Sequence, residues 1–242
     1  MTGTLYLIPN TLGDTEPTGV NAVLPVGVRD IALRLDYFVG ENAKTTRAYL
    51  KQLGVTRPLQ EIRIDELNVK TPAAAIDGLL APLLAGRDAG LVSEAGCPAV
   101  ADPGALLVRR AHERGVTVRP LVGPSSILLG IMASGLDGQR FAFNGYLPTD
   151  AEARRRALLD FEQHSRRHAQ TQAFIETPYR NEALLDALLT HCHADTRLAI
   201  AADLTLPQET ILSASIADWR RRRAAGSLPA LRKRPTLFML LA

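Results

Sequence analysis

Two stretches of small and hydroxyl-bearing residues stand out as places where this sequence could bind a ligand. The first, residues 93–104, reads Ser-Glu-Ala-Gly-Cys-Pro-Ala-Val-Ala-Asp-Pro-Gly and follows the short apolar run 89–92. The second, Gly123-Pro-Ser-Ser126, follows a predicted strand over residues 116–122. Small residues let a ligand approach the backbone and leave N–H groups that face it. Because ligands bind at the carboxyl ends of strands in open α/β sheets, the two turns predict one shared pocket.

An ordinary structural interpretation competes with this one. Asp102 is predicted as the N-cap of a helix with Pro103 in its first turn, so the stretch is also typical of a well-capped loop. Either turn alone fits both interpretations equally well. The repetition of the pattern in two neighbouring strand–helix units favours a ligand pocket.

The elements that must position these turns alternate between strand and helix through the first half of the chain. Periodicity and turn residues predict strands over 4–8, 37–39, 61–67, 89–92 and 116–122, and helices over 28–35, 72–86, 103–114 and 124–134, with one more between Lys44 and Gly54. This alternation is typical of a parallel sheet covered by helices. A GxGxxG motif and a Walker-type phosphate loop are both missing, which argues against a dinucleotide-binding unit and the commonest methyltransferase fold.

The second half has a different pattern. Its predicted strands cover residues 141–147, 171–176, 197–204, 209–215 and 235–241, and its predicted helices cover 151–164, 181–191 and 216–225. Two successive strands without a helix between them indicate a hairpin and therefore a mixed sheet. We predict an α/β protein of two domains, residues 1–122 with a parallel sheet and residues 123–242 with a mixed sheet.

Composition and charge narrow the class of protein. No apolar run is long enough to span a membrane, and no basic region precedes the first apolar run, so we expect neither a membrane segment nor a signal peptide. Cys97 and Cys192 have no metal-ligand spacing, which predicts a cytoplasmic protein without a metal site. The net charge of +3 lies in residues 121–242, where arginines cluster at 154–156, 166–167, 220–223 and 232–234. Such clusters are typical either of an RNA-binding surface or of solvated helix faces.

Several motifs in order along the chain resemble one known family. They are Leu5-Tyr-Leu-Ile-Pro9 with Leu12-Gly-Asp14, Leu91-Val-Ser-Glu-Ala-Gly-Cys-Pro98, Asp102-Pro-Gly104, Pro120-Leu-Val-Gly-Pro-Ser125 and Phe143-Asn-Gly-Tyr-Leu-Pro148. The chain resembles the tetrapyrrole methylase superfamily, and within it the ribosomal RNA small-subunit methyltransferase I group. The resemblance implies an S-adenosylmethionine-dependent methyltransferase of two α/β domains. It also implies a homodimer, with the cofactor in a cleft between the domains and no metal.

The resemblance also assigns residues to the site. It implies cofactor contacts by Pro9, Glu94, Ala95, Gly96, Val100, Ser125, Ser126, Tyr146, Leu147, Pro235 and Thr236. The group has an acidic-Thr-Arg motif where this chain has Glu41-Asn42-Ala-Lys44, so Glu41, Asn42 and Lys44 are candidate substrate contacts. No residue is identified as a catalytic base.

Three functions remain open. The first is methyl transfer to RNA, with the ribose 2'-hydroxyl of small-subunit ribosomal RNA as one candidate acceptor. The second is methylation of a tetrapyrrole-like or other small molecule, and the third is an S-adenosylmethionine-binding module without catalysis. Tyr179 and Arg180 either face the site or start a helix capped by Thr177, and Trp219 either stacks on a base or anchors a basic helix.

Overall fold

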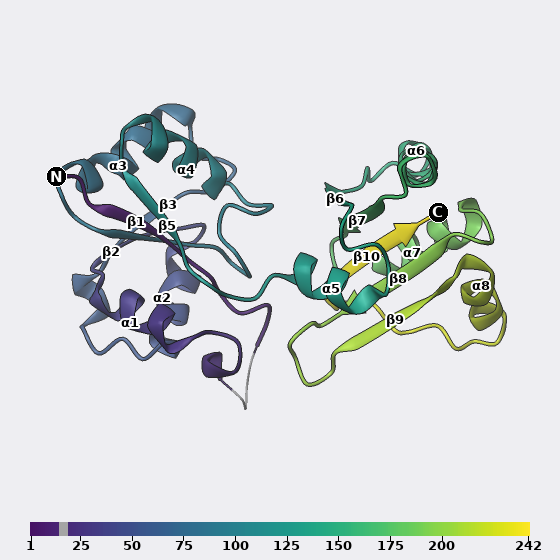
Figure 1. The fold of residues 1–242 in the computed structure, drawn as a ribbon. Helices are drawn as coiled ribbons and strands as arrows, with labels where there is room; N and C mark the ends of the chain where they lie inside the picture. The colour runs from purple at the N-terminus through teal and green to yellow at the C-terminus, as the bar shows by residue number, and fades with distance from the viewer. Residues whose placement is uncertain (15–18) are drawn as a thin grey trace. The chain divides into compact units, whose positions relative to one another are not determined.

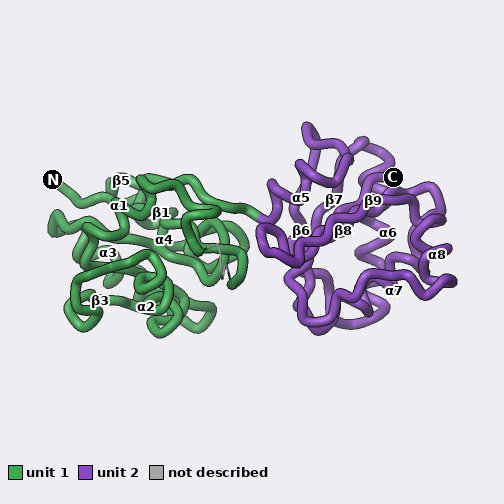
Figure 2. Tube along the Cα trace, turned by 90° about the horizontal axis from the view of Figure 1, so that it is seen from below, with its two compact units in different colours: residues 1–125 green, residues 126–242 purple. Residues whose placement is uncertain are grey.

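The computed structural model describes residues 1–14 and 19–242, and it divides into two compact units. Unit 1 comprises residues 1–125 and unit 2 comprises residues 126–242 (Figure 2). Among the described residues, every helix is too short or too polar to cross a membrane.

Unit 1 is built on a five-stranded sheet, here called sheet A (Figure 1). Its strands are β1 (Thr4–Ile8), β2 (Tyr37–Gly40), β3 (Arg63–Glu66), β4 (Ala89–Val92) and β5 (Thr117–Pro120). They are ordered β3-β2-β4-β1-β5, and every pairing is parallel. This confirms the parallel sheet predicted for the first half.

Helices cover both faces of sheet A because its strands are apolar on both sides. The helices are α1 (Val26–Arg34), α2 (Ala43–Gln52), α3 (Ile76–Leu84) and α4 (Gly104–Glu113), with short 3-10 turns at Val20–Ala22, Leu59–Glu61 and Ala73–Ala75. In β2, Phe38 packs in the cluster with α1 and α2, whereas Tyr37 and Val39 pack in the cluster with α3 and α4. The alternating side chains of one strand therefore fill two separate cores.

The start of α4 differs in detail from the sequence prediction. The helix begins at Gly104 and Pro103 is its N-cap residue, so Asp102 is one position too early to be the N-cap. The Asp102 carboxylate nevertheless accepts hydrogen bonds from the N–H groups of Gly104, at 2.7 Å, and Ala99, at 2.9 Å. Asp102 therefore ties the loop after β4 to the first turn of α4.

Unit 2 is built on a second five-stranded sheet, sheet B. Its strands are β6 (Phe141–Tyr146), β7 (Thr171–Ile175), β8 (Arg197–Ala202), β9 (Thr210–Ser215) and β10 (Thr236–Leu241). The order is β6-β7-β10-β8-β9; β6 and β7 are parallel, and the other neighbours are antiparallel. The predicted hairpin and mixed sheet are confirmed.

The helices of unit 2 are divided between the two faces of sheet B (Figure 1). They are α5 (Ser126–Ser134), α6 (Ala151–His168), α7 (Asn181–His191) and α8 (Ile216–Ala224). Helices α6, α7 and α8 enclose a core that contains Phe174, Trp219 and Phe238. Helix α5 packs on the other face, where the hydrogen-only side chain of Gly130 allows close contact with Leu237.

Helix α6 is one turn longer than predicted. Its apolar pattern ends near residue 161, but the helix continues to His168 and closes on Ala169 in a left-handed conformation. Ser165 is buried in this last turn, and its hydroxyl accepts a hydrogen bond from the backbone N–H of Ala242. A tertiary contact therefore extends the helix beyond its sequence signal.

Candidate functional site

The loops that leave sheet A all gather at one edge, because parallel strands end on the same side. The loop after β1 and the loop after β4 are neighbours, since β1 and β4 are paired with Ile8 opposite Val92. The loop after β2 lies on the other side of β4, where Gly40 is opposite Val92. The topology therefore brings together residues 9–14, 41–44 and 93–102.

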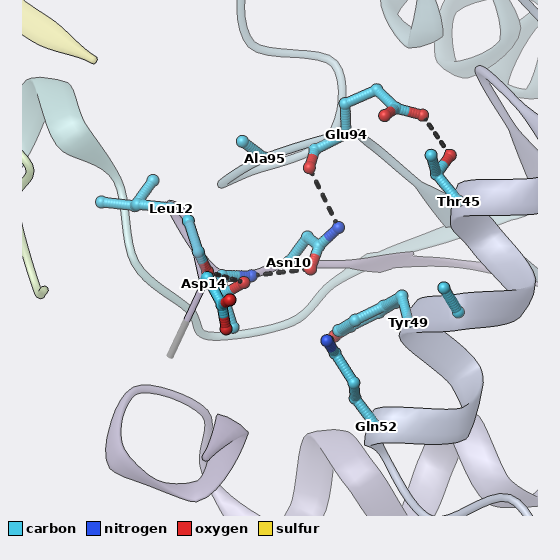
Figure 3. Close-up of a pocket in the computed structure, with 11 residues that line it drawn as sticks. Asn10, Leu12, Asp14, Thr45, Tyr49, Gln52, Glu94 and Ala95 are labelled. Atoms are coloured by element: carbon cyan, nitrogen blue, oxygen red, sulfur yellow. Dashed lines mark hydrogen bonds between the residues drawn. The ribbon is translucent and has the colours of Figure 1, made fainter. Parts of the chain in front are cut away.

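Asn10 joins the loop after β1 to the loop after β4 (Figure 3). Its side-chain amide donates to the carbonyl oxygens of Ser93 and Glu94, at 3.0 and 3.1 Å, and its side-chain oxygen accepts from the N–H of Thr11 at 2.8 Å. The backbone N–H of Asn10 also donates to the carbonyl of Gly96 at 2.9 Å. These bonds fix the two loops in one arrangement.

A pocket of about 390 Å³ opens beside these loops. It is lined by Asn10, Thr11, Leu12, Gly13, Asp14, Thr45, Ala48, Tyr49, Gln52, Glu94 and Ala95. Figure 3 shows the side chains of Tyr49 and Gln52 extending from α2 toward the loop that carries Asn10. Its volume falls within the range of small-molecule sites, about 300–1,000 Å³.

The predicted residues of unit 1 occupy different positions around this pocket. Glu94 and Ala95 line it directly. Pro9 is buried, and its carbonyl accepts a hydrogen bond from the Tyr49 hydroxyl at 2.5 Å. Gly96 is also buried and has φ +67°, a conformation that favours glycine. Val100 is about half exposed and lies outside the residues that line the pocket.

Hydrogen-bonding groups remain available in the pocket wall. Within the described part of the chain, the backbone N–H groups of Leu12, Gly13 and Ala95 make no hydrogen bond. The Glu94 carboxylate accepts from the Thr45 hydroxyl at 2.5 Å through one oxygen, so its second oxygen can accept from a ligand. The wall therefore offers both donors and a charged acceptor.

The candidate substrate residues lie at the start of α2. Asn42 caps this helix, because its side-chain oxygen accepts from the N–H groups of Lys44, at 2.8 Å, and Thr45, at 3.3 Å. Glu41 accepts from the N–H of Glu94 at 3.3 Å. Lys44 is exposed, and its side chain forms no ion pair among the described residues.

Burial and neighbouring charges control the ionisation of Glu41. Burial raises the pKa of its carboxyl, the hydrogen bond from Glu94 opposes this increase, and the charges of Asp102 and Glu94 add to it. Burial likewise raises the pKa of Asp102, against the hydrogen bonds from Gly104 and Ala99. Glu41 and Asp102 therefore retain their protons to a higher pH than exposed carboxyls do.

Ser125 is the last residue of unit 1 and follows a tightly packed turn. A Cβ on Gly123 would lie 2.2 Å from the Cβ of Pro9, so only glycine lets the loop after β5 pass beside the loop after β1. This contact brings the second small-residue turn next to Pro9, as the sequence pattern predicts. Within unit 1, the two turns therefore lie at the same edge of sheet A.

The predicted residues of unit 2 lie at one edge of sheet B, except Ser126, which begins α5. Ile175 at the end of β7 pairs with Tyr146 on one side and with Leu237 on the other, which brings Tyr146 near the start of β10. Tyr146 is 58% exposed, whereas Leu147 is 4% exposed and belongs to the unit 2 core. Leu147 could thus contact a ligand only through its main chain.

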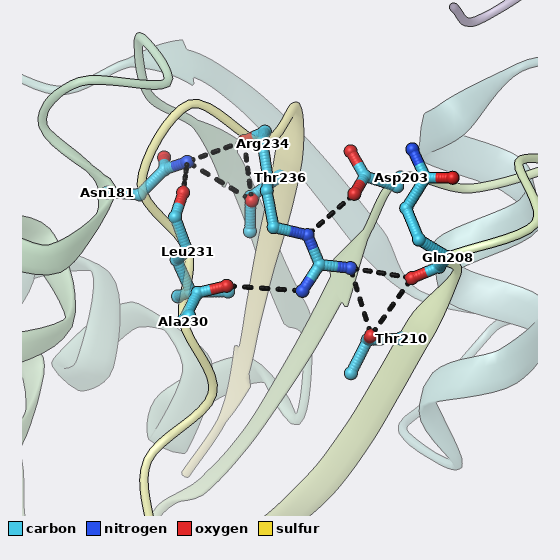
Figure 4. Close-up of polar contacts among 8 residues, drawn as sticks. All are labelled: Asn181, Asp203, Gln208, Thr210, Ala230, Leu231, Arg234 and Thr236. Atoms are coloured by element: carbon cyan, nitrogen blue, oxygen red, sulfur yellow. Dashed lines mark hydrogen bonds and ion pairs between the residues drawn. The ribbon is translucent and has the colours of Figure 1, made fainter.

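Pro235 and Thr236 are held at this edge by hydrogen bonds, and Figure 4 shows those of Thr236. The N–H of Asp203 donates to the carbonyl of Pro235 at 2.9 Å. The hydroxyl of Thr236 donates to the carbonyl of Arg234 at 2.9 Å and accepts from the Asn181 amide at 3.1 Å. Thr236 is almost fully buried, so its position is fixed by unit 2 itself.

Arg234 is the centre of this network. Its guanidinium donates to Asp203 at 2.6 Å and to the carbonyls of Gln208 and Ala230 at 2.7 and 3.1 Å (Figure 4). It also donates to the hydroxyl of Thr210 at 2.9 Å. Arg234 therefore joins the ends of three segments, although the sequence places it in a cluster of candidate RNA contacts.

Sequence reasoning missed Asn10, Thr45, Tyr49 and Gln52. Asn10 carried a usable signal, because a polar residue two positions after a buried strand lies where ligands bind. Thr45, Tyr49 and Gln52 are spaced as one helix face, and only the packing of α2 shows that this face borders a pocket. No group of three metal-ligating side chains forms among the described residues.

Comparison with known proteins places the chain in a family. A model of the tetrapyrrole (corrin/porphyrin) methylases matches residues 19–219. The ribosomal RNA small subunit methyltransferase I of Xylella fastidiosa is 32% identical over 215 residues, which cover 89% of this chain and 73% of that protein. The protein of the same name from Neisseria meningitidis serogroup B is 31% identical over 216 residues, which cover 89% of this chain and 69% of its own.

A solved structure shares the fold. The methyltransferase CobJ matches with a TM-score of 0.63 at 17% identity, and the match covers 99% of this chain and 94% of that one. This agrees with the two sheets described above. The chain therefore belongs to the tetrapyrrole (corrin/porphyrin) methylase family and is a methyltransferase.

Proposed function

We propose that this protein transfers the methyl group of S-adenosylmethionine to small-subunit ribosomal RNA. The observation that carries the proposal is the 32% identity over 89% of the chain with a ribosomal RNA small subunit methyltransferase I. The pocket at the edge of sheet A supports the cofactor part, because it is formed by the same loops that carry the family motifs.

The residues of the pocket fit this cofactor. Its carboxylate needs N–H donors, which the backbone of Leu12, Gly13 and Ala95 can supply. Its ammonium and ribose hydroxyl groups need acceptors, for which the Glu94 carboxylate is placed. We propose that Pro9, Gly96 and the remaining predicted residues of unit 1 shape the backbone around the same ligand.

The cofactor supplies an electrophilic methyl group on a sulfonium centre, so the protein mainly has to hold and align the reactants. Asn10 contributes by fixing the two loops that form the pocket. Glu41 accepts from the backbone N–H of Glu94 and so ties the loop after β2 to the loop after β4. A hydroxyl acceptor such as a ribose 2'-hydroxyl also has to lose a proton to a base.

The basic residues of unit 2 divide into two kinds, which bears on RNA as the acceptor. In α8, Arg220 donates to the carbonyls of Leu189 and Cys192, both at 2.7 Å. Arg221 forms an ion pair with Asp218, and Arg223 lies 3.9 Å from the Asp186 carboxylate. These arginines stabilise unit 2. Among the described residues, Arg232 and Lys233 form no ion pair, and they are the better candidates for phosphate contacts.

Trp219 is excluded from base stacking. Its side chain is fully buried, and the indole N–H donates to the carbonyl of Leu198 at 2.9 Å. It therefore anchors α8 on the core, and the base-stacking hypothesis for this residue is wrong.

We further propose a cytoplasmic location, because the proposed target is ribosomal RNA. We also propose that the protein is a homodimer, as the family resemblance implies.

Calorimetric titration with S-adenosylmethionine tests the cofactor pocket. Glu94→Gln keeps the shape of the side chain and an oxygen that can accept from Thr45, but it removes the negative charge. We expect this variant to bind S-adenosylmethionine about 10-fold more weakly or worse, since a hydrogen bond to a charged group contributes about 1.5–3 kcal/mol. Glu61→Gln is the matched control, because Glu61 is exposed in unit 1 and lies outside the pocket. Unchanged binding by Glu94→Gln would contradict the assignment of this pocket.

Methyl transfer to purified small ribosomal subunits or their RNA tests the acceptor. Incubation with radiolabelled S-adenosylmethionine should label the RNA, and mapping the labelled nucleotide would show whether the 2'-hydroxyl is modified. Labelling of a tetrapyrrole extract without any labelling of RNA would favour the small-molecule function. Tight cofactor binding without transfer to either acceptor would favour the non-catalytic module.

A further inference from the structure

Aromatic and cationic side chains gather at the edge of sheet B where α7 begins. Tyr179 lies between β7 and α7 and is 73% exposed. Arg232 and Lys233, which precede β10, are also exposed. The backbone N–H of Lys233 donates to the carbonyl of Pro178 at 2.9 Å, so the segment with the two cations lies directly beside the segment with Tyr179.

Arg180 belongs to the same surface and is held by a buried carboxylate. Its Nε and Nη2 donate to one oxygen of Glu176, at 3.0 and 2.6 Å, and the backbone N–H of Thr177 donates to the same oxygen at 2.6 Å. The Glu176 side chain is fully buried, whereas that of Arg180 is 36% exposed. The Nη1 group of Arg180 makes no hydrogen bond within the described residues, so this N–H edge is oriented and available.

Two of the three cations on this surface have no acidic partner. Neither Arg232 nor Lys233 forms an ion pair within the described part of the chain. Glu176 balances the charge of Arg180, so Arg180 supplies directed N–H groups while Arg232 and Lys233 supply the net positive charge. Arg234, the next residue, points inward to Asp203 and does not add to this surface.

An exposed aromatic ring beside oriented and unpaired cations matches the chemistry of unpaired nucleotides. Single-stranded RNA is bound by stacking its bases on aromatic rings and by contacts from cations to its phosphates. A duplex offers no free base face to such a ring. A protein partner is less well matched, because the surface has three cations around a single aromatic residue.

We propose that Tyr179, Arg180, Arg232 and Lys233 bind one unpaired nucleotide of an RNA strand. The base stacks on Tyr179, Arg180 donates from Nη1 to its phosphate, and Arg232 and Lys233 attract the neighbouring phosphates. Glu176 acts as a positioning residue for Arg180. This inference rests on the proposed function, because it supplies the RNA contact that methylation of RNA requires.

Fluorescence anisotropy of the full chain with a short labelled single-stranded RNA tests this surface. We expect Tyr179→Ala to weaken binding about 10-fold and Tyr179→Phe to bind like the wild type, because the stacking face is retained. The double variant Arg232→Ala/Lys233→Ala should weaken binding and reduce the slope of log affinity against log salt by about 1.4, since each phosphate contact on a single strand contributes about 0.7.

Arg167→Ala is the matched control. Arg167 is an exposed arginine near the end of α6, just before the opposite end of β7, and should leave RNA affinity nearly unchanged. The fluorescence of Trp219, the single tryptophan and buried in unit 2, confirms that each variant is folded. If Tyr179→Ala binds RNA like the wild type, or Arg167→Ala weakens binding as much as Arg232→Ala/Lys233→Ala, the inference is wrong although RNA remains the acceptor. If the wild type neither binds nor methylates RNA, the proposed acceptor itself fails.

Discussion

Removing the guanidinium of Arg234 should strongly destabilise unit 2. The side chain of Asp203 is 5% exposed and that of Arg234 is 21% exposed, and their atoms are 2.6 Å apart. In Arg234→Ala, the Asp203 carboxylate would stay buried without its cation. The hydroxyl of Thr210 would lose its donor, and the carbonyl of Gln208 would lose one of its two donors, in the same step (Figure 4).

The size of the effect follows from this burial. Breaking a buried ion pair by removing one partner costs about 3–5 kcal/mol, because the remaining charge is uncompensated. The total unfolding free energy of a domain is about 5–15 kcal/mol, so the loss is a large share of it. The double variant Arg234→Ala/Asp203→Ala removes both charges and should cost clearly less than the sum of the two single variants.

Urea unfolding followed by tryptophan fluorescence measures this change. The chain has a single tryptophan, and Trp219 is buried in unit 2, so the signal reports on the unit that contains the pair. Arg232→Ala is the control, since this neighbouring arginine is exposed and should change the unfolding free energy by less than about 0.5 kcal/mol. A loss below about 1 kcal/mol for Arg234→Ala, or single variants whose losses add up to that of the double variant, would show that the pair does not stabilise unit 2.

Three further predictions concern the cores and one thiol. Trp219→Phe should lower the unfolding free energy by about 1–3 kcal/mol, measured by circular dichroism, because it removes the hydrogen bond from the indole N–H to the carbonyl of Leu198 and leaves a smaller ring in a packed core. Gly90→Ala should destabilise unit 1 by about 1–3 kcal/mol, since a Cβ would lie 2.7 Å from atoms of Ile8 and Phe38. Gly78→Ala, on α3 with open space around it, should be neutral or stabilising, and equal effects of both glycine substitutions would contradict this packing argument. Burial, with a smaller contribution from the charge of Glu162, raises the pKa of Cys192 from about 9 to about 12, against the opposing charge of Arg220. As the pH rises, the thiol therefore ionises in the unfolded state before it does so in the native state. The unfolding free energy should fall between about pH 9 and pH 12, and the fall should be smaller in Cys192→Ala. If the native thiol reacts with Ellman's reagent at pH 8 as fast as the unfolded one, the thiol is not buried.

The positions of most helices and strands, and the α/β class of the fold, follow from local sequence signals. Strong periodicity, with helix caps and Gly or Pro turns, located the strands of sheet A and the β8–β9 hairpin, because these signals are local. It also located the small-residue turns after β4 and β5, since a strand followed by glycine and serine is visible without tertiary information. The order of the motifs gave the family, which the comparisons confirm.

Contacts between side chains that are distant in the sequence depend on how the elements pack. Strand order places the loop after β1 next to the loop after β4, which is why Asn10 and not a predicted residue connects them. Trp219 and Arg234 are candidates for RNA contacts in the sequence, but in the structure Trp219 is buried and Arg234 pairs with the buried Asp203. Arg232 and Lys233, from the same part of the sequence as Arg234, are exposed. A sequence pattern records residue types along the chain, whereas burial and partners depend on contacts between residues far apart in it.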